Sequence, residues 1–376
     1  MTGRRTSAEL ALKSLSRTSS RHASTSAAAA AAAPGAEPTP YLHNLLQRTD
    51  RPSYLLSHSF SQPPHRLAYL AIRSFNAELA TIPESVSNDL LGKIRFGWWR
   101  DSIRALYASI EHGQAVPVSA RGQPVLQALH AVLCDPALRE TPTQGFLHSE
   151  HHFQALISAR EDDLLSASSS HTPPTLEQME RYAERTASRL AYLELDLLGI
   201  RDPAMDEVCS HIGKARGLTT ALASIPFHAH MMIPTTTPPA LTSRARRLVL
   251  PQEYLLAHRV VEEEVYRKGS HAEGLKDAVF DTATRANDYL ISARSALRRA
   301  FGHDSSTQTT TARKRRKPPK LLDPVLMGAI PAKVFLEALE RVQFDPFHPT
   351  LIQEPTGWRL TWALWKASWR GAAKTF

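Results

Sequence analysis

LAYLAIRSFNAELATI, residues 67–82, is the stretch of sequence that decides the fold. Its apolar and small side chains recur at steps of three and four, which predicts an amphipathic helix with a broad inward face. That face carries one carboxylate, Glu78, and the positions beside it, Ala77 and Thr81, cannot bind a cation. The helix therefore has the form of one that lines a pocket, without the acids that metal chemistry needs.

The same spacing extends over the rest of the chain and predicts an all-α protein, because strand patterns are essentially absent. Helices are predicted at residues 41–48, 64–82, 86–112, 121–134, 145–165, 175–199, 204–223, 251–268, 271–301, 331–342 and 355–373. Thr175 and Gln178 resemble a capping box at the start of the 175–199 helix, and Gly199 supplies its stop. Pro226 is expected to break its helix, and a proline-rich loop is expected at 233–243.

The formal charge of +9 invites a nucleic-acid reading, but its location argues against one. Five Lys or Arg and one acid lie in residues 1–36, and six Lys or Arg and one acid lie in residues 302–320. Without these two segments, 34 basic residues face 34 acidic residues. The folded body is therefore neutral, and no nucleic-acid partner is expected.

Two segments have the composition of unfolded chain. Residues 1–36 are basic, rich in Ser and poor in acids, which is typical of a mitochondrial transit peptide, although a generic disordered tail would look similar. Residues 302–320 read as a disordered basic insert in a helical domain that spans 37–376. The basic run Arg313–Lys317 inside the insert resembles a nuclear localisation signal or a phosphate-binding patch, but a solvated loop is the preferred interpretation.

The chain offers little for metal or disulfide chemistry. Cys134 and Cys209 lie far apart without partner ligands, so neither a disulfide framework nor a zinc site follows. No catalytic residue, metal site or cofactor is predicted. No run of about 18 apolar residues occurs, so a transmembrane helix is not expected.

The C-terminal helix carries four tryptophans, which we call the tryptophan face: Trp358, Trp362, Trp365 and Trp369. Their spacing places the four indoles within about 60° of one another around the helix axis. Two interpretations remain open. The indoles could close the core of the bundle, or they could form a docking surface for a membrane or a partner protein, since Lys and Arg flank them.

The order of segments resembles the squalene and phytoene synthase superfamily, and within it the branch of the mitochondrial NADH dehydrogenase (complex I) assembly factor 6. The stretches that carry the resemblance cover nearly all of 41–376 outside the insert: RSFNAELA (73–80), IRFGWWRDSI (94–103), ISAREDDL (157–164), YAERTASRLAYLELDLLGI (182–200), HIGKARGLTTALASIPFH (211–228), RRLVLPQEYL (246–255) and VQFDPFHPTL (342–351). The resemblance implies an isoprenoid-synthase-type helical bundle.

Enzymes of this superfamily join two prenyl diphosphates, and two Asp-rich helix segments hold the magnesium ions that grip the diphosphate. By the resemblance, the first segment falls on Ala77, Glu78 and Thr81, and the second falls on 224–228, from Ser224 to His228. Only one acid remains, so prenyl transfer is expected to be lost. Three further residues, Arg73, Tyr182 and Ser188, align with segments that line the enzymes' cavity, which leaves a vestigial pocket that a lipid or isoprenoid could fill.

The resemblance thus implies a non-catalytic assembly factor for respiratory complex I, located in the mitochondrion on the matrix side of the inner membrane and in peripheral contact with it. Its partners would be complex I subunits or assembly intermediates. The alternative is an active prenyltransferase of the squalene/phytoene synthase type that uses Glu78 with unusual ligands.

Overall fold

The computed structural model describes residues 38–140, 144–169, 172–229, 246–301, 318–353 and 357–375. Every regular element among these residues is a helix, which confirms the predicted all-α class. The predicted leader (1–36), the proline-rich loop (233–243) and most of the insert (302–317) lie outside the described residues. Of the insert, Lys320 begins a short 3₁₀ helix.

The helices of the first half of the chain run from the N-terminus to the long helix α8. They are α2 (Pro38–Thr49), α3 (Arg51–Leu56), η1 (Ser57–Ser59), α4 (Pro63–Ser85), α5 (Asp89–Glu111), η2 (Val118–Ala120), α6 (Pro124–Cys134), α7 (Pro136–Arg139), η3 (Gly145–His148) and α8 (Glu150–Ser169). The first turn of the predicted 145–165 helix is thus the separate 3₁₀ turn η3.

The helices of the second half are built around α11 and α15. They are α9 (Leu176–Ala183), η4 (Glu184–Ser188), α10 (Arg189–Leu197), α11 (Pro203–His228), α13 (Gln252–Ala257), α14 (Glu262–Lys268), η5 (Gly269–His271), α15 (Leu275–Phe301), η6 (Lys320–Leu322), α16 (Asp323–Met327), α17 (Ile330–Arg341), α18 (Pro349–Gln353), α19 (Gly357–Arg370) and η7 (Ala372–Lys374). The predicted 251–268 helix is two helices, because Arg259 between them has a φ of +55° and cannot continue α13.

The predicted 175–199 helix begins and ends as expected but contains an irregular turn. The Thr175 side chain accepts a hydrogen bond from the Gln178 backbone N–H, and the Gln178 side chain accepts one from the Thr175 backbone N–H. The capping box is therefore confirmed. Gly199, with a φ of +67°, follows the last turn as predicted. Between α9 and α10, the π-helical turn η4 inserts a wider turn that the apolar spacing did not predict.

The expected break at Pro226 is wrong. Helix α11 passes through Pro226 and ends only at His228. Proline removes one backbone hydrogen bond and crowds the preceding turn, and only two helical residues follow Pro226. The ring is buried, and the backbone N–H of Ala229 still closes the last turn on Ile225.

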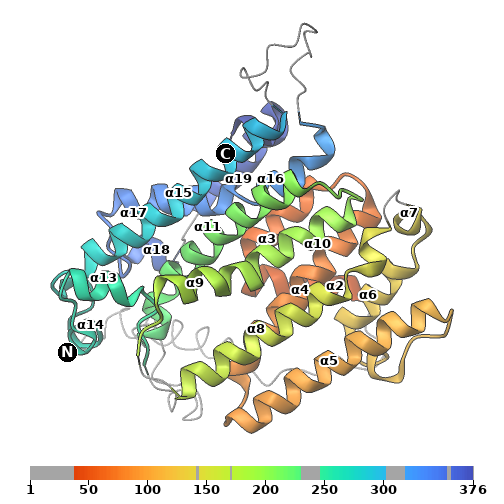
Figure 1. Cartoon of the computed structure of the whole chain (residues 1–376), viewed down its shortest axis with the longest axis horizontal. Coiled ribbons are helices and arrows are strands. Elements are labelled where there is room, and N and C mark those ends of the chain that lie inside the picture. The colour runs from red at the N-terminus through yellow and green to blue at the C-terminus, as the bar shows by residue number, and fades with distance from the viewer. Residues whose placement is uncertain are drawn as a thin grey trace, which may run out of the picture.

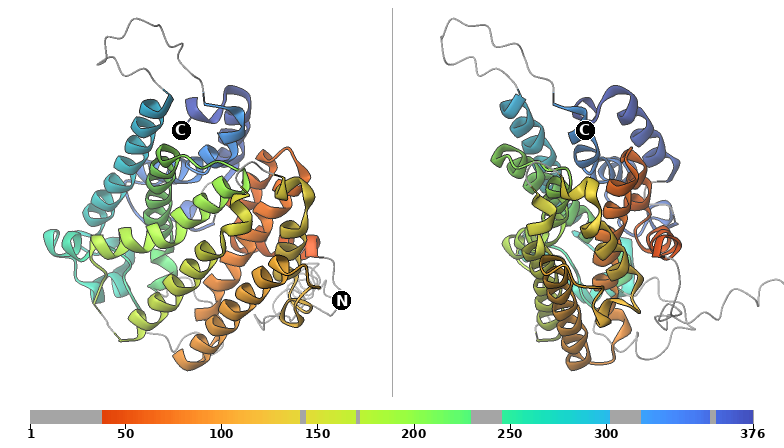
Figure 2. Two further views of the ribbon diagram at one scale, coloured as in Figure 1. Left: turned by 45° about the vertical axis from the view of Figure 1, so that its right-hand side comes forward. Right: turned by 90° about the vertical axis from the view of Figure 1, so that its right-hand side faces the viewer.

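Figure 1 shows α11 in the middle of the bundle, with α15 lying alongside it and α9 and α10 crossing on its other side. The N-terminal helices α2, α4 and α6 pack on one another, and α8 joins α4 to α5. In the views of Figure 2, α19 lies at the periphery, near the described C-terminal end. Within the described residues, no helix is both long and apolar enough to cross a membrane.

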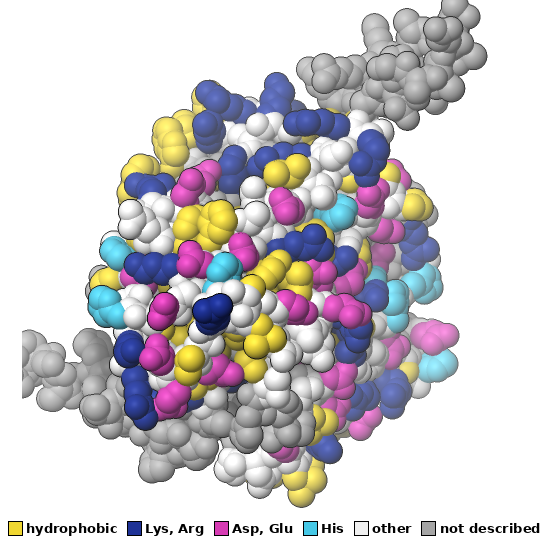
Figure 3. Space-filling view, turned by 60° about the vertical axis from the view of Figure 1, so that its left-hand side comes forward, with side chains coloured by type: hydrophobic (Ala, Val, Ile, Leu, Met, Phe, Trp, Pro, Cys, Tyr) yellow, Lys and Arg dark blue, Asp and Glu magenta, His cyan; other side chains and the backbone are white. Residues whose placement is uncertain are grey.

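Two apolar clusters fill the bundle. The larger joins α2–α11 to α15, α16 and α17, and includes fully buried Phe75, Phe96 and Phe153. The smaller lies between the C-terminal end of α11, α13–α15 and α17. Acidic and basic side chains are interspersed over the outer face seen in Figure 3, in keeping with a neutral body.

Two glycines bring α11 unusually close to the α9–η4 segment. A Cβ on Gly213 would lie 2.2 Å from Oγ and 2.4 Å from Cα of Ser188, and one on Gly217 would lie 2.3 Å from Cβ of Ala183. These distances leave no room for a methyl group. The spacing of small residues along α11 therefore sets the distance between the two central helical segments.

We expect Gly213→Ala to lower the free energy of unfolding by about 1–3 kcal/mol, because the new methyl group must push the two segments apart. Gly97→Ala is the matched control, since Gly97 is also inside a helix but has nothing within 4 Å of its added Cβ. That control should raise stability by about 0.5–1 kcal/mol through helix propensity. Urea unfolding measures both, and equal effects of the two substitutions would contradict the close-packing account.

Candidate functional site

Glu78, the acid left at the first metal-binding segment, is engaged within the protein. It lies half-buried on α4, and its carboxylate accepts a hydrogen bond from the Tyr41 hydroxyl of α2. Burial raises the pKa of Glu78 above its ordinary value, against the opposing effects of that hydrogen bond and of Arg95. A carboxylate that is costly to ionise and already hydrogen-bonded is a poor magnesium ligand.

The other residues of the two segments supply no further carboxylate. Ala77 is buried in the core, and the Thr81 hydroxyl donates to the Glu78 carbonyl of its own helix at 2.9 Å. On α11, the Ser224 hydroxyl donates to the Ala221 carbonyl at 2.7 Å, and His228 is the last helical residue.

The magnesium ions that the fold implies therefore do not fit these residues. Mg²⁺ takes oxygen ligands in octahedral geometry, usually one or two carboxylates together with water and substrate phosphates, and a cluster of ions needs such carboxylates for each ion. The two segments offer one carboxylate, Glu78, together with hydroxyls turned onto their own helices. In the part of the chain that the structure describes, no three Asp, Glu, His or Cys side chains are grouped as a metal ion would require.

A polar bridge that the sequence analysis missed links the predicted pocket residue Tyr182 to α4. Arg160 of α8 donates to the Tyr182 hydroxyl at 2.8 Å and to Oδ1 of Asn76 at 3.0 Å. Burial raises the pKa of Tyr182, although the nearby Arg160 opposes the shift. Two features of the sequence could have indicated this bridge. Asn76 lies directly before Ala77 in the first segment, and Arg160 is the first residue of the charged stretch REDDL.

The three acids that follow Arg160 look like a metal-binding run in the sequence, but they diverge in space. Glu161 pairs with Arg100 of α5 at 2.6 Å, and Asp162 pairs with Arg185 of η4 at 2.7 Å. Asp163 pairs with Arg247, at 3.2 and 3.4 Å. Successive helical positions point about 100° apart, so the three carboxylates reach three different partners and do not converge.

Arg73, another predicted pocket residue, forms a buried ion pair with Glu194 of α10. Both side chains are almost fully buried, with 3% and 2% exposure, and the Arg73 guanidinium lies 5.2 Å from the Tyr69 ring centroid. Burial lowers the pKa of Arg73, but the Glu194 carboxylate, together with Tyr69 and Asp50, outweighs burial and raises that pKa above its usual range. Partly buried Arg216 of α11 is a second cation close enough to interact with both.

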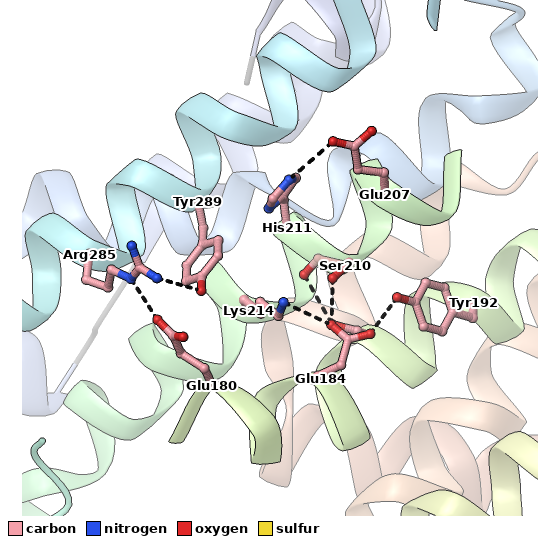
Figure 4. A network of polar contacts seen from close by, with 10 residues as sticks. Glu180, Glu184, Tyr192, Glu207, Ser210, His211, Lys214, Arg285 and Tyr289 are labelled. Atoms are coloured by element: carbon pink, nitrogen blue, oxygen red, sulfur yellow. Dashed lines mark hydrogen bonds and ion pairs between the residues drawn. The ribbon is translucent and has the colours of Figure 1, made fainter. Parts of the chain in front are cut away.

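Ser188 and its neighbour Glu184 in η4 belong to a different network, and Figure 4 shows Glu184 with its partners. Buried Ser188 donates to the Ser210 carbonyl at 3.2 Å. Glu184 accepts from the hydroxyls of Tyr192 and Ser210, each at 2.6 Å, and lies 3.7 Å from Lys214. Burial would raise the pKa of Glu184, but the hydrogen bonds and the lysine outweigh it and lower that pKa.

One turn away in Figure 4, Glu180 pairs with Arg285 of α15 at 2.7 Å, and Arg285 donates to the Tyr289 hydroxyl at 3.1 Å. The irregular turn thus places Glu184 against α11 while Glu180 reaches α15. Each carboxylate of this network has hydrogen-bond or ion-pair partners within the fold, and the arrangement joins helices.

The tryptophan face lies on the surface, which decides between the two interpretations of its burial. The four indoles are 49–79% exposed, while Leu360 and Ala367 turn the opposite side of α19 into the core. Closure of the core by these indoles is therefore excluded.

The predicted site residues thus fall into separate environments. Arg73 and Ser188 belong to helix packing. Glu78 is hydrogen-bonded to α2, Thr81 bonds to its own helix, and the tryptophan face is far along the chain. What the arrangement can do is hold helices together, and among the residues that the structure describes no acids converge as they do in a metal-dependent transferase.

Comparison with known proteins gives the family and its named relatives. The family model of squalene/phytoene synthase matches residues 46–366. The Bos taurus protein named NADH dehydrogenase (ubiquinone) complex I, assembly factor 6, is 30% identical over 330 residues, 88% of this chain and 81% of that protein. The Homo sapiens protein of the same name is 29% identical over 338 residues, 90% of this chain and 84% of that protein.

Two solved structures are similar in fold. A dehydrosqualene synthase in complex with ligand has a TM-score of 0.62 at 15% identity, covering 90% of this chain and 97% of its own. The squalene synthase of Alicyclobacillus acidocaldarius has a TM-score of 0.56 at 14% identity, covering 82% of this chain and 95% of its own. These likenesses confirm the predicted isoprenoid-synthase-type bundle.

We expect Glu78→Gln to raise the free energy of unfolding at pH 7. Because burial raises the folded-state pKa of Glu78, folding favours the protonated form, and ionisation at neutral pH lowers stability. The gain in the free energy of unfolding should shrink as the pH falls and vanish below the pKa of glutamate in the unfolded chain, about 4.3. Urea unfolding between pH 4 and 7 measures it, with exposed Glu111→Gln as the control. A destabilised variant at pH 7 would contradict the account.

Burial raises the pKa of Glu194 as it does that of Glu78, but here the carboxylate faces a buried arginine that stays charged. Glu194→Gln should therefore lower the free energy of unfolding by about 3–5 kcal/mol, since it leaves the Arg73 cation buried without its carboxylate. Arg73→Met should cost less, because Arg216 remains beside Glu194. Denaturant unfolding of both variants checks the order. A larger loss for Arg73→Met would show that Arg216 does not compensate.

Proposed function

This chain belongs to the squalene/phytoene synthase family, and we propose that it is a non-catalytic member that assists the assembly of respiratory complex I (NADH:ubiquinone oxidoreductase). The observation that carries the proposal is similarity over 88–90% of the chain to proteins named complex I assembly factor 6. The similarity includes the helical body and is not confined to one segment. The partners would be complex I subunits or assembly intermediates.

The interior chemistry supports the absence of prenyl transfer. A leaving diphosphate carries concentrated negative charge, which metal-bound carboxylates must help to neutralise. Here Glu78 is hydrogen-bonded to Tyr41, and the three acids at 161–163 are paired with three arginines. The competing function, a prenyltransferase that uses Glu78 with unusual ligands, would need those pairs to break during turnover.

The location follows from the same proposal. A complex I assembly factor would act in the mitochondrion, on the matrix side of the inner membrane and in peripheral contact with it. The basic, Ser-rich and acid-poor composition of residues 1–36 supports import through a transit peptide.

Deletion of the gene should reduce assembled complex I on native gels of mitochondrial membranes, with the other respiratory complexes retained. Re-expression of the wild-type chain should restore complex I. Glu78→Gln should restore it equally well, because the proposed role uses no carboxylate chemistry at this position. Glu111→Gln, at an exposed position of α5, is the matched control.

Two results would overturn the proposal. Normal complex I in the deletion strain would remove the assembly role. Restoration by Glu111→Gln but not by Glu78→Gln, with equal protein levels, would favour the prenyltransferase.

A further inference from the structure

The last long helix, α19, has two opposite faces. At about 100° per residue, Leu360, Leu364 and Ala367 fall on one side, and the tryptophan face falls about 180° away. Leu360 and Ala367 are fully buried against the bundle, whereas Trp358 and Trp369 are 71% and 79% exposed. The helix is thus fixed to the body by one side and presents its largest apolar groups to the outside.

A row of cations runs beside the tryptophan face. Arg359, Lys366 and Arg370 fall about 80–120° around the axis from Trp358, all on the same flank. All three are exposed, and α19 contains no Asp or Glu. Thr361 and Ser368 occupy the other flank. A neutral body therefore carries, on this one helix, apolar rings next to concentrated positive charge.

The indoles are arranged as a continuous apolar surface. The rings of Trp362 and Trp365 stack with centroids 4.8 Å apart, and those of Trp365 and Trp369 lie 5.6 Å apart. A shallow groove runs along them and is lined by Trp362, Trp365, Trp369, Lys366 and Arg370. Its walls are apolar, and its rim on one side is cationic.

We propose that α19 is an in-plane docking helix for a lipid surface with anionic headgroups. Indole rings favour the boundary between headgroups and acyl chains, where an apolar body and one N–H donor are both accommodated. Lys and Arg beside them reach the headgroup phosphates, and each such cation strengthens attachment by about fivefold. The helix would lie parallel to the membrane with its tryptophan face down.

The charge pattern favours lipid over a protein partner. A protein that covered α19 would have to present an apolar surface edged by carboxylates along the whole helix, of about 21 Å at 1.5 Å per residue. A membrane of anionic lipid supplies both requirements everywhere on its surface, without a matched shape. This inference rests on the peripheral-membrane part of the proposed function and does not depend on the role in complex I assembly.

Vesicle binding of the purified chain tests the proposal, with phosphatidylcholine vesicles with and without phosphatidylglycerol. The wild-type chain should bind the anionic vesicles more tightly. Trp362→Ser/Trp365→Ser should weaken that binding about tenfold or more, because two rings leave the interface. The control Leu256→Ser/Ile291→Ser removes two exposed apolar side chains on other helices and should change nothing.

Two double variants, one on α19 and one on α15, separate the contribution of the positive charge on α19 from that of the tryptophans. Lys366→Ser/Arg370→Ser should weaken binding to the anionic vesicles about tenfold or more and leave binding to neutral vesicles unchanged. Lys276→Ser/Arg298→Ser removes the same charge from α15 and should have little effect. In the wild-type chain, lipid brominated on its acyl chains should quench tryptophan fluorescence, which tests insertion without any substitution.

Absence of quenching, or equal losses in the α19 variants and their controls, would overturn the proposal. So would unchanged binding of the Trp362→Ser/Trp365→Ser variant. Equal binding of the wild-type chain to neutral and anionic vesicles would refute the anionic preference. None of these results depends on complex I, so they are distinguishable from failure of the assembly role.

Discussion

Charge taken out of water must be paired or hydrogen-bonded within the fold, and this requirement shapes the interior of the bundle. Arg73 is matched by Glu194, Arg160 by two neutral acceptors, and Glu184 by two hydroxyls and a lysine. Glu78 meets the tyrosine hydroxyl of α2. The inward polar side chains thus serve cohesion between helices, where a metal-dependent enzyme would hold convergent acids for its substrate.

This use of polar groups fits a scaffold whose shape is kept for reasons other than prenyl transfer. Gly213 and Gly217 allow α11 to lie against α9 and η4, and ion pairs join α8 to η4 and to Arg247 in the segment before α13. An outer helix, α19, then carries exposed tryptophans on a body that is otherwise mixed in charge. In the proposed function, the inner part of the molecule would supply rigidity and α19 would supply recognition.

Much of the fold was readable from the sequence, because apolar spacing at three and four residues fixes where long helices lie. Local irregularities were not. The π-helical turn η4 and the continuation of α11 through Pro226 leave no mark in the spacing of apolar residues. The sequence showed that only one acid remains at 77–81. It did not show that the carboxylates of Glu161–Asp163 pair with three different arginines. Periodicity also gave the tryptophan face but could not say which side of α19 faces the core.

The most direct test of the central claim is calorimetric titration of the purified chain with a non-hydrolysable farnesyl diphosphate analogue, with and without Mg²⁺. The account predicts no magnesium-dependent binding, because the donors that would hold the ions are lacking or already bonded. Magnesium-dependent binding that Glu78→Gln abolishes would contradict it and restore the case for an enzyme.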